Sequence, residues 1–587
     1  MKEDTKKKKK LHNKVTFKDY NQHQMWLLPP SLGELLGPHH IARLVNDIIE
    51  GMDLEPILNT YEGGGASSYH PRMLLKALVY GYIKKCYSSR SIEEACKENI
   101  GFMWLCGMQQ PDHNTLNRFR KHQMKDTVKT VFAHVLNHLI EKGHVRLNDY
   151  YVDGTKIESV ANRYTYVWAK NVKRFKSGLL DKIAVLLDQI EQANDDAEGK
   201  VASTTKTSQS AEQQLATPID TQSEVAKGKE QKVDNSNSLK QTIKQLNKDL
   251  AAELTQNKSL KKKLEQLEKE HLPKLMEYEQ HEINLNGRNS YSKTDIDATF
   301  MRTKDDHLGN GQLKPCYNWQ FGTEDQFVVN YTVHQTPSDM VCFTEHMTDT
   351  FELLESIDAP KPKRTTADAG YGSEENYEFL EQNEVEAYVK YPGYYKEDKK
   401  AKPKQVFQSS RLYYNEEQDC FICPMGQKMN YTSSFQQKTK TGFEQEIRCY
   451  EAQRCEGCPL RGTCFKSKED NRLIKFNRNA YYHRKKAKQK LQSLRGIKLR
   501  KQRNVDVEPV FGHLKQCRGF RRCLLKGVQG VNIETGFLTI AHNLKKLHVK
   551  MQSPRISLPN PLKNPPNCAQ IIPIYYQMEL FEEKVRV

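Results

Sequence analysis

The stretch "YYVDGTKIES", residues 150–159, decides the fold. An apolar run ends at the carboxylate of Asp153, and Gly154 follows directly. The same arrangement returns at "RTTADAG", residues 364–370, where a β-prone segment ends at Asp368 and a glycine follows within two residues. Glycine frees the backbone to turn away, so each carboxylate is expected at the rigid end of a strand. We therefore predict two neighbouring strands that bring both aspartates together.

Two carboxylates at such close quarters point to chemistry at phosphorus. They repel each other unless a cation neutralises them, and Mg²⁺ in proteins typically takes one or two carboxylates plus water and substrate phosphate. A pair of such ions clamps the attacking and leaving oxygens of a phosphodiester displacement. Taken singly, either aspartate is more simply explained as the cap of the following helix, so the prediction rests on the repetition of the pattern.

The overall charge indicates a polyanionic partner. The 587 residues include 91 Lys and Arg against 73 Asp and Glu, and the formal net charge is +18. Such a surplus is typical of nucleic-acid binding, and a well-solvated ribosomal or tail-like protein is the alternative. A chain of this length is expected to fold as roughly three or four domains.

The sequence contains no membrane or export signal that we recognise. No stretch approaches the roughly 20 continuous apolar residues that a transmembrane helix needs. The basic opening "MKEDTKKKKK" lacks an apolar segment behind it, unlike a signal peptide. We expect a cytoplasmic, nucleoid-associated protein with no membrane contact, in which clustered cysteines bind metal rather than form disulfides.

Residues 25–143 are predicted to form an all-helical domain. Ser91 and Glu94 have the spacing of a capping box, and Asp112 is expected to cap a further helix. Basic side chains projecting near one turn would suit a helix-turn-helix reader of DNA, and an ordinary helical bundle with a basic surface is the alternative. These side chains are Arg118, Arg120, Lys121 and Lys125.

A long insertion is expected to interrupt the domain that follows. Residues 195–238 are polar and of low complexity, with almost nothing to bury. The next segment carries apolar residues in one heptad frame, which predicts a helical hairpin or short coiled coil, with a lone solvated helix as the alternative. The heptad residues are Ile243, Leu246, Leu250, Leu260, Leu264 and Leu267.

Beyond the insertion the pattern changes from helical to strand-like. Residues 317–323 and 327–334 are predicted to pair as a hairpin. A helix capped by Ser338, a strand ending at Asp368, a helix opened by Ser373 and the strand "EAYVKYP" follow in order. This alternation predicts an α/β (α+β) fold around the two aspartates.

A third carboxylate is expected from a later helix among basic residues. Glu508, in "RNVDVEPVFGHLK", is followed two helical turns later by Lys515 on the same face, and Arg503 precedes it. A carboxylate in such a cationic stretch is either a simple ion-pair partner or a metal ligand flanked by phosphate contacts. The motif fits both interpretations.

Taken together, these motifs resemble a known family. "VDGTKIES", "YNWQFGTE", "ADAGYG" and "VEPVFGHLK" are similar to the DDE transposases of bacterial insertion sequences, in particular the subgroup with a helical N-terminal domain and a cysteine-rich insert. "SSRSIEEACKEN" and "PDHNTLNRFR" resemble the N-terminal region of that subgroup. The resemblance covers roughly residues 25–550.

The resemblance implies an RNase-H-like catalytic domain in which Asp153, Asp368 and Glu508 hold two Mg²⁺ (or Mn²⁺) ions. It also implies that Arg503 and Lys515 contact DNA phosphates, which position DNA without reading its sequence. The family pattern places a Tyr and an Arg before the glutamate. Here Lys501 and Asn504 stand at those two positions, with Arg503 one residue away from the second.

The resemblance and the composition divide the chain as follows. The predicted parts are a disordered basic arm at 1–24; a helical DNA-binding domain at 25–143; the first part of the catalytic domain at 144–164 and 286–400; a helical insertion with a low-complexity segment and a coiled coil at 165–285; a cysteine-rich zinc insert at 401–475; the last part of the catalytic domain at 476–550; and a Pro-rich tail at 551–587.

The cysteine-rich insert carries two Cys-x-x-Cys pairs, a strong indication of a structural Zn²⁺ site with four thiolates. Six cysteines compete for the four places: Cys420, Cys423, Cys449, Cys455, Cys458 and Cys464. The residues alone leave the choice open, and Cys420 has a claim because it completes the first pair. The resemblance favours Cys423, Cys455, Cys458 and Cys464.

The function that the resemblance implies is transposition. The enzyme is expected to nick DNA at the terminal inverted repeats of a transposon and to join the freed 3′-hydroxyl to target DNA. Because two ends must be held in one complex, a homo-oligomer, in the simplest case a dimer, is expected. The alternatives are a catalytically inactive DNA-binding protein derived from a transposase and a scaffolding protein built around the coiled coil.

Overall fold

The computed structural model describes residues 31–61, 68–203, 235–249, 258–303, 311–396 and 407–552. The predicted basic arm at 1–24 lies outside these ranges. Most of the low-complexity segment and all but two residues of the predicted Pro-rich tail lie outside them as well. In the described part, no helix is both long and apolar enough to cross a membrane.

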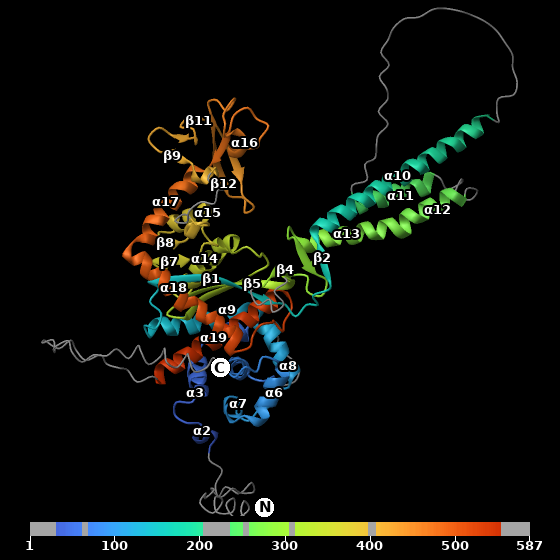
Figure 1. The fold of residues 1–587 in the computed structure, drawn as a ribbon. Coiled ribbons are helices and arrows are strands. Elements are labelled where there is room, and N and C mark those ends of the chain that lie inside the picture. Colours follow the sequence, from blue (N-terminus) through green and yellow to red (C-terminus); the bar gives the residue numbers. More distant parts are fainter. Residues whose placement is uncertain are drawn as a thin grey trace, which may run out of the picture.

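Within the described ranges, a mixed sheet of six strands forms the centre of the protein (Figure 1). Its order is β4–β5–β1–β7–β8, and β6 pairs with the same edge of β5 as β4. β1 is antiparallel to β5 and parallel to β7, which is parallel to β8. The strands are β1 (Asp149–Glu158), β4 (Thr299–Arg302), β5 (Leu313–Glu324), β6 (Phe327–His334), β7 (Arg364–Ala367) and β8 (Glu386–Val389). The predicted α/β class and the predicted hairpin, β5–β6, are confirmed.

Helices cover both faces of this sheet. Successive side chains of β1 point to opposite faces. Tyr150 meets α14 through His346 Nε2 at 2.9 Å, whereas Asp153 meets α18 through Arg503 Nη1 at 3.1 Å. The helices around the sheet are α14 (Asp339–Glu355), α15 (Glu374–Gln382), α17 (Arg478–Gln492), α18 (Leu494–Gly512) and α19 (Gly527–Gln552).

The N-terminal helices share one continuous core with the sheet. The ring of Tyr82 stacks on Phe537 of α19 at 5.3 Å, and the ring of Phe132 meets Tyr331 of β6 at 5.1 Å. The N-terminal elements are α2 (Leu32–Leu35), α3 (Ile41–Glu50), α4 (Glu55–Leu58), α5 (Pro71–Ile83), α6 (Ser89–Glu98), α7 (Ile100–Leu105), α8 (His113–Arg118), η1 (Phe119–Gln123) and α9 (Met124–Glu141).

Two local predictions in this region need correction. Ser88, not Ser91, caps α6, because its hydroxyl accepts from the Ser91 backbone N–H. Arg120 does not project toward DNA: it is buried, and its guanidinium donates to the carbonyl of Tyr87 at 2.9 Å. The predicted cap Asp112 is confirmed, since its carboxylate accepts two backbone N–H groups of α8.

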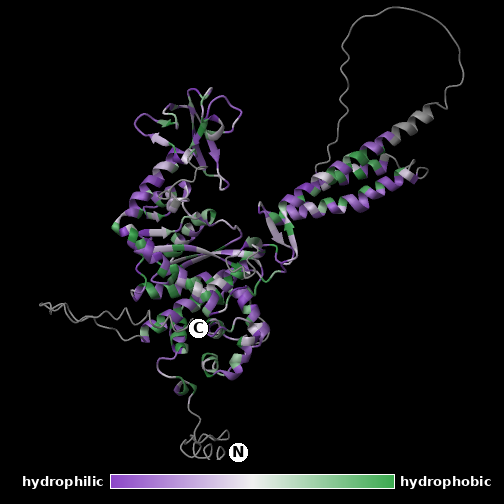
Figure 2. Cartoon of the chain, in the orientation of Figure 1, coloured by the Kyte–Doolittle hydropathy of each residue, from purple (hydrophilic) through white to green (hydrophobic). Residues whose placement is uncertain are grey.

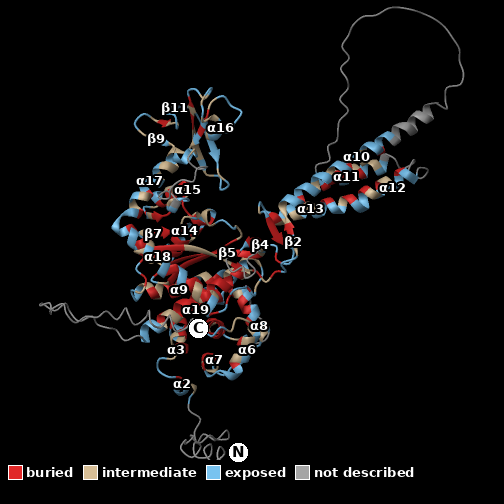
Figure 3. Cartoon of the chain, in the orientation of Figure 1, coloured by how far each residue is buried: buried red, intermediate tan, exposed pale blue. Residues whose placement is uncertain are grey.

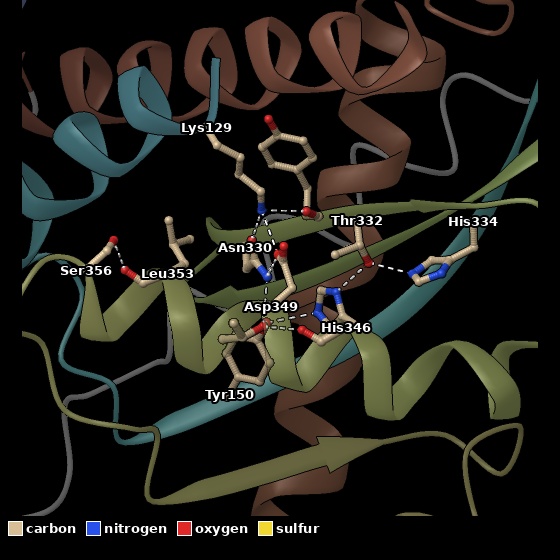
Figure 4. A network of polar contacts seen from close by, with 11 residues as sticks. Lys129, Tyr150, Asn330, Thr332, His334, His346, Asp349, Leu353 and Ser356 are labelled. Atoms are coloured by element: carbon tan, nitrogen blue, oxygen red, sulfur yellow. Dashed lines mark hydrogen bonds and ion pairs between the residues drawn. The ribbon is translucent and has the colours of Figure 1, made fainter. Parts of the chain in front are cut away.

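A polar network ties α9 to β6, β1 and α14 on the α14 face of the sheet (Figure 4). Lys129 of α9 donates to Asn330 Oδ1 at 2.6 Å and to Asp349 Oδ2 at 2.7 Å. On the same face, the Tyr150 hydroxyl contacts His346, which bonds Thr332. Burial lowers the pKa of His346 well below its usual value, so the ring is neutral in this network.

A helical arm extends from a short ribbon of two strands (Figure 1). Its helices share a buried apolar cluster that includes Ile243, Leu260, Leu264 and Leu267 of the predicted heptad, whereas Leu250 lies outside the described residues. Along each arm helix, apolar residues alternate with hydrophilic ones (Figure 2). The elements are β2 (Tyr166–Trp168), α10 (Ala169–Ser203), α11 (Ser236–Asp249), α12 (Lys258–Gln266), η3 (Leu267–His271), α13 (Leu272–Leu285) and β3 (Ser290–Ser292).

The cysteine-rich segment forms a separate small sheet between β8 and α17. Its strand order is β13–β12–β11–β10–β9, and aromatic residues fill a core of its own. Burial is concentrated in the central sheet and the helices against it, while much of this small unit is exposed (Figure 3). The elements are β9 (Tyr413–Asn415), β10 (Cys420–Ile422), β11 (Lys428–Lys438), β12 (Glu444–Ala452), α16 (Arg461–Cys464) and β13 (Leu473–Phe476).

Candidate active site

Asp153 lies in the middle of β1, not at its end. β1 continues through Gly154 to Glu158, and Asp153 stands opposite Phe321 of β5. The expectation that Gly154 lets the strand turn away is therefore wrong. A Cβ at Gly154 would instead collide with the amide of Gln320 and lie 2.8 Å from Asp339 Oδ1. The glycine is required by close packing on the α14 side of the sheet.

Asp368 follows the last residue of β7 and lies level with Asp153. In the parallel pairing of β1 with β7, Val152 stands opposite Ala367, so the two aspartates occupy the next positions on neighbouring strands. Adjacent strands are about 4.8 Å apart, so the two backbones are close at this level. The carboxylate of Asp368 accepts the backbone N–H of Gly370 at 2.7 Å, which fixes the turn after the strand.

Glu508 reaches the same place from α18 through a shared arginine. Arg503 Nη1 lies 3.1 Å from Asp153 Oδ2, and Arg503 Nη2 lies 3.2 Å from Glu508 Oε1. Only 8% of the Arg503 side chain and 15% of the Asp153 side chain are exposed, against 52% for Glu508. One guanidinium thus joins carboxylates that are separated by most of the chain.

The other carboxylate of this segment faces away. Asp506 Oδ1 accepts the hydroxyl of Thr323 at 2.6 Å and the backbone N–H of Gln326 at 3.0 Å, and its side chain is buried. Desolvation raises the pKa of Asp506. The two acidic residues therefore lie on different sides of α18, with Glu508 turned toward Asp153 and Asp506 turned away from it.

The two predicted phosphate-binding residues occupy different environments. Arg503 is buried between Asp153 and Glu508, as described above. Lys515 lies in η7 (His513–Cys517), and its ammonium donates to the carbonyl of Lys156 on β1 at 3.2 Å. Both cations therefore contact β1, the strand that carries Asp153.

The acidic group fits a divalent cation in its chemistry. Carboxylate oxygens are the ligands that Mg²⁺ and Mn²⁺ prefer. The site already attracts positive charge, because Arg503 bridges two of its three members. In the described part of the chain, however, no three His, Cys, Asp or Glu side chains stand together as a preformed metal group.

The charges of the site act on a neighbouring phenol. Burial, followed by the charges of Asp153, Asp339 and Asp368, raises the pKa of Tyr371 well above its usual value. The neutral hydroxyl of Tyr371 therefore donates to Gln320 Oε1. Asp339, the first residue of α14, was not among the residues predicted for the site. Its only sequence signal is its place directly after the cap position Ser338.

Four of the six clustered cysteines line one small cavity. They are Cys423, Cys455, Cys458 and Cys464, the set that the family resemblance favoured. Arg472 Nη1 donates to Cys464 Sγ at 2.7 Å, and the Gln427 backbone N–H donates to Cys423 Sγ at 3.3 Å. Cys420 and Cys449 are buried within β10 and β12 and do not line the cavity. Four cysteine sulfurs are the ligands of many structural zinc sites, so this set fits Zn²⁺ in its chemistry.

Comparison with known protein families adds independent support. Residues 422–548 match the family model of the transposase DDE domain, and residues 30–122 match that of a transposase domain (DUF772). The first match includes Glu508, Arg503, Lys515 and the four cysteines of the cavity, whereas Asp153 and Asp368 lie outside both matches. No curated protein and no solved structure matches the chain.

Proposed function

The chain is a DDE-type transposase of an insertion sequence, and we propose that it cleaves DNA at transposon ends and transfers the freed strands into target DNA in a Mg²⁺-dependent reaction. The observation that carries this proposal is the convergence of Asp153, Asp368 and Glu508. The parallel register of β1 and β7 brings the first two level, and Arg503 joins Asp153 to Glu508.

The strand order supports an RNase-H-like catalytic domain. Along β6–β5–β1–β7–β8 the first three strands are antiparallel and the last two run parallel to β1. That is the arrangement the family resemblance implies. The arm inserted between β1 and β5 and the cysteine-rich unit inserted between β8 and α17 leave this order intact.

In the proposed mechanism the protein supplies position and charge. Asp153, Asp368 and Glu508 would hold two Mg²⁺ or Mn²⁺ ions, which activate a water and stabilise the leaving oxygen at phosphorus. The central sheet would hold Asp153 and Asp368 in position before DNA arrives, because Asp153 belongs to β1 and Asp368 directly follows β7. Lys515, and Arg503 once it leaves the carboxylates, would contact backbone phosphates, which would set the register of the DNA without reading its sequence.

About half of the Glu508 side chain is exposed, so this carboxylate can change its position more easily than that of Asp153. In the structure Glu508 is held by the guanidinium of Arg503 rather than by a strand. A cation bound among the three carboxylates would compete with Arg503 for Asp153 and Glu508. We infer that Arg503 leaves these carboxylates when the metal is bound and is then free to turn toward a phosphate.

The cysteine cavity is proposed to hold a structural Zn²⁺ ion. Four thiolates fill a tetrahedral site, leaving no position for a substrate, so its role would be to stabilise the small sheet. Exposed lysines and arginines on this unit, including Lys438 and Arg454, would make it a further DNA contact. The proposed partners are therefore the terminal inverted repeats, target DNA and a second copy of the chain, in the cytoplasm beside the nucleoid.

The proposal is tested by incubating the purified protein with Mg²⁺ and a labelled duplex that carries the terminal inverted repeats of the element. We expect nicking at the repeat boundary by the wild type and none by Asp153→Asn or Asp368→Asn, with DNA binding retained. A wild type that binds the duplex but never nicks it would favour the inactive DNA-binding alternative. Mutants that nick as the wild type does would refute the site assignment.

A further inference from the structure

Gly154 and Gly370 flank a carboxylate that belongs to neither motif. An ideal Cβ on Gly154 would lie 2.8 Å from Asp339 Oδ1. An ideal Cβ on Gly370 would lie 3.9 Å from Asp339 Oδ2 and 2.9 Å from Asp368 Oδ1. The Asp339 carboxylate therefore rests against bare backbone at both glycines and shares the turn after β7 with Asp368.

Two buried amides hold this carboxylate in place. Asn318 Nδ2 donates to Asp339 Oδ1 at 2.7 Å, and Gln320 Nε2 donates to the same oxygen at 3.0 Å. Both amide residues are fully buried on β5, and Gln320 in turn accepts the hydroxyl of Tyr371. The bonds fix Oδ1, while Oδ2 is the oxygen nearer to the turn that carries Asp368.

A role in starting the helix does not account for these contacts. Asp339 is the first residue of α14, where an acidic side chain favours the helix dipole by about 0.3–1 kcal/mol. That benefit needs neither two buried amide donors nor two glycines. Oxygens of Asp339 and Asp368 both lie within 4 Å of the ideal Cβ position of Gly370. Two carboxylates this near to one point repel each other unless a cation neutralises them, which points to a ligand at this place.

The arrangement also accounts for residues of two motifs that the proposed mechanism does not use. In "YNWQFGTE" the second and fourth residues are Asn318 and Gln320, and in "ADAGYG" the fifth residue is Tyr371. The chain of hydrogen bonds from Tyr371 to Gln320 to Asp339 is continuous. It links the segment after Asp368 to the carboxylate beside Gly154, so both motifs converge on the same side chain.

We propose that Asp339 is a fourth acidic residue of the catalytic site and binds the divalent metal ion together with Asp368. Asn318 and Gln320 act as positioning residues, because they orient the carboxylate and contact no substrate. The inference rests on the proposed function, since the metal it concerns is the one that Asp153, Asp368 and Glu508 would hold.

Mn²⁺ binding to the full chain tests this directly. The free Mn²⁺ signal in electron paramagnetic resonance is titrated for the wild type, Asp339→Asn and the control Glu352→Gln, an exposed acid on the same helix. The amide introduced by Asp339→Asn keeps an oxygen that accepts from Asn318 and Gln320, so folding is expected to persist. We expect Mn²⁺ affinity to fall about 10-fold or more in Asp339→Asn, with no change in the control.

The outcomes separate this inference from the proposed function. If the wild type nicks DNA and binds Mn²⁺, and Asp339→Asn does both equally well, only the role of Asp339 is refuted. If the wild type neither binds Mn²⁺ nor nicks, the proposed function itself fails. Should Asp339→Asn unfold, Asp339→Glu keeps the charge and decides the point: unchanged Mn²⁺ affinity would mark Asp339 as structural, and weakened affinity supports the metal role.

Discussion

The acidic site and the cysteine cavity both bring together side chains that are distant in the sequence. They differ in the size of the hydrophobic core that holds these side chains in place. Asp153 and Asp368 stand on neighbouring strands of a core that also includes the N-terminal helices. Cys455 and Cys464 lie in loops and a short helix against a sheet whose core contains few residues. A catalytic group needs a rigid frame, whereas a structural metal can supply part of the frame itself.

The difference predicts the largest effect in the cysteine unit. Replacing Cys455 and Cys458 together by serine should remove the proposed structural Zn²⁺ ion, whose binding is worth about 10 kcal/mol in small structural sites. The sheet β9–β13 should then become sensitive to protease while the central sheet stays resistant. Zinc content by atomic absorption and limited proteolysis with mass spectrometry measure both effects. Cys517→Ser, an exposed cysteine outside this unit, is the matched control.

Substituting an acidic residue of the site should abolish DNA nicking without unfolding the central sheet. Glu508→Gln should lower the nicking rate by about 1000-fold, or about 4 kcal/mol, because a metal ligand stabilises charge in the transition state. The melting temperature should change little, since the side chain is mostly exposed. Asp506→Asn is the control on the same helix, and its nicking should match the wild type. Equal losses in both variants would contradict the assignment of Glu508.

Substituting Arg503 should change the stability of the protein differently in the presence and in the absence of a divalent cation. In Arg503→Gln, the mostly buried Asp153 loses its ion pair with the guanidinium, which should cost about 3 kcal/mol of unfolding free energy in EDTA. Added Mn²⁺ should restore more stability to this variant than to the wild type, because the metal replaces the missing charge. Denaturant unfolding with and without Mn²⁺ measures the difference. If Mn²⁺ raised the unfolding free energy of both proteins equally, the guanidinium and the metal would not bind the same carboxylates.

The frame itself should weaken in acid. Burial lowers the pKa of His542 to about 3, and that of His513 beside it to about 4. Unfolded histidine titrates near 6.5, so the unfolded chain binds more protons below about that pH and stability falls as pH decreases. For His542 the loss is about 2 kcal/mol at about pH 5. His542→Gln should reduce the difference in unfolding free energy between pH 7 and pH 5 by that amount, and an unchanged difference would contradict it.

Much of the acidic site could be predicted from local patterns. The repeated carboxylate and glycine signalled two strands, and the basic helix signalled Glu508. The pairing of those strands was predicted from the repetition of the pattern alone, since only β7 is followed directly by a helix, whereas β1 runs on to β2 and the helical arm. The role of Gly154 was missed since a glycine that permits a turn and one that permits close packing look the same in sequence.

The proposed role of Asp339 could not be predicted from the sequence, because it depends on contacts with residues of other strands. It resembles an ordinary acidic residue in the first turn of a helix, and only the folded chain places it beside Gly154 and Gly370. The prediction that Arg120 projects toward DNA was wrong because Arg120 is buried, although its basic neighbours in the sequence are exposed. The choice among six cysteines was open from spacing, since burial of Cys420 and Cys449 is set by strand pairing.

We propose that Asp153, Asp368 and Glu508 form one divalent metal site, and metal-directed cleavage of the backbone tests this most directly. Fe²⁺ bound at such a site, in the presence of ascorbate and hydrogen peroxide, cuts the nearby backbone, and the fragments can be mapped by mass spectrometry. We expect cleavage near residues 153, 368 and 508 in the same preparation, and we expect Mg²⁺ to suppress it by competing with Fe²⁺. Cleavage confined to one of these segments, or found only near the cysteine cavity, would contradict it.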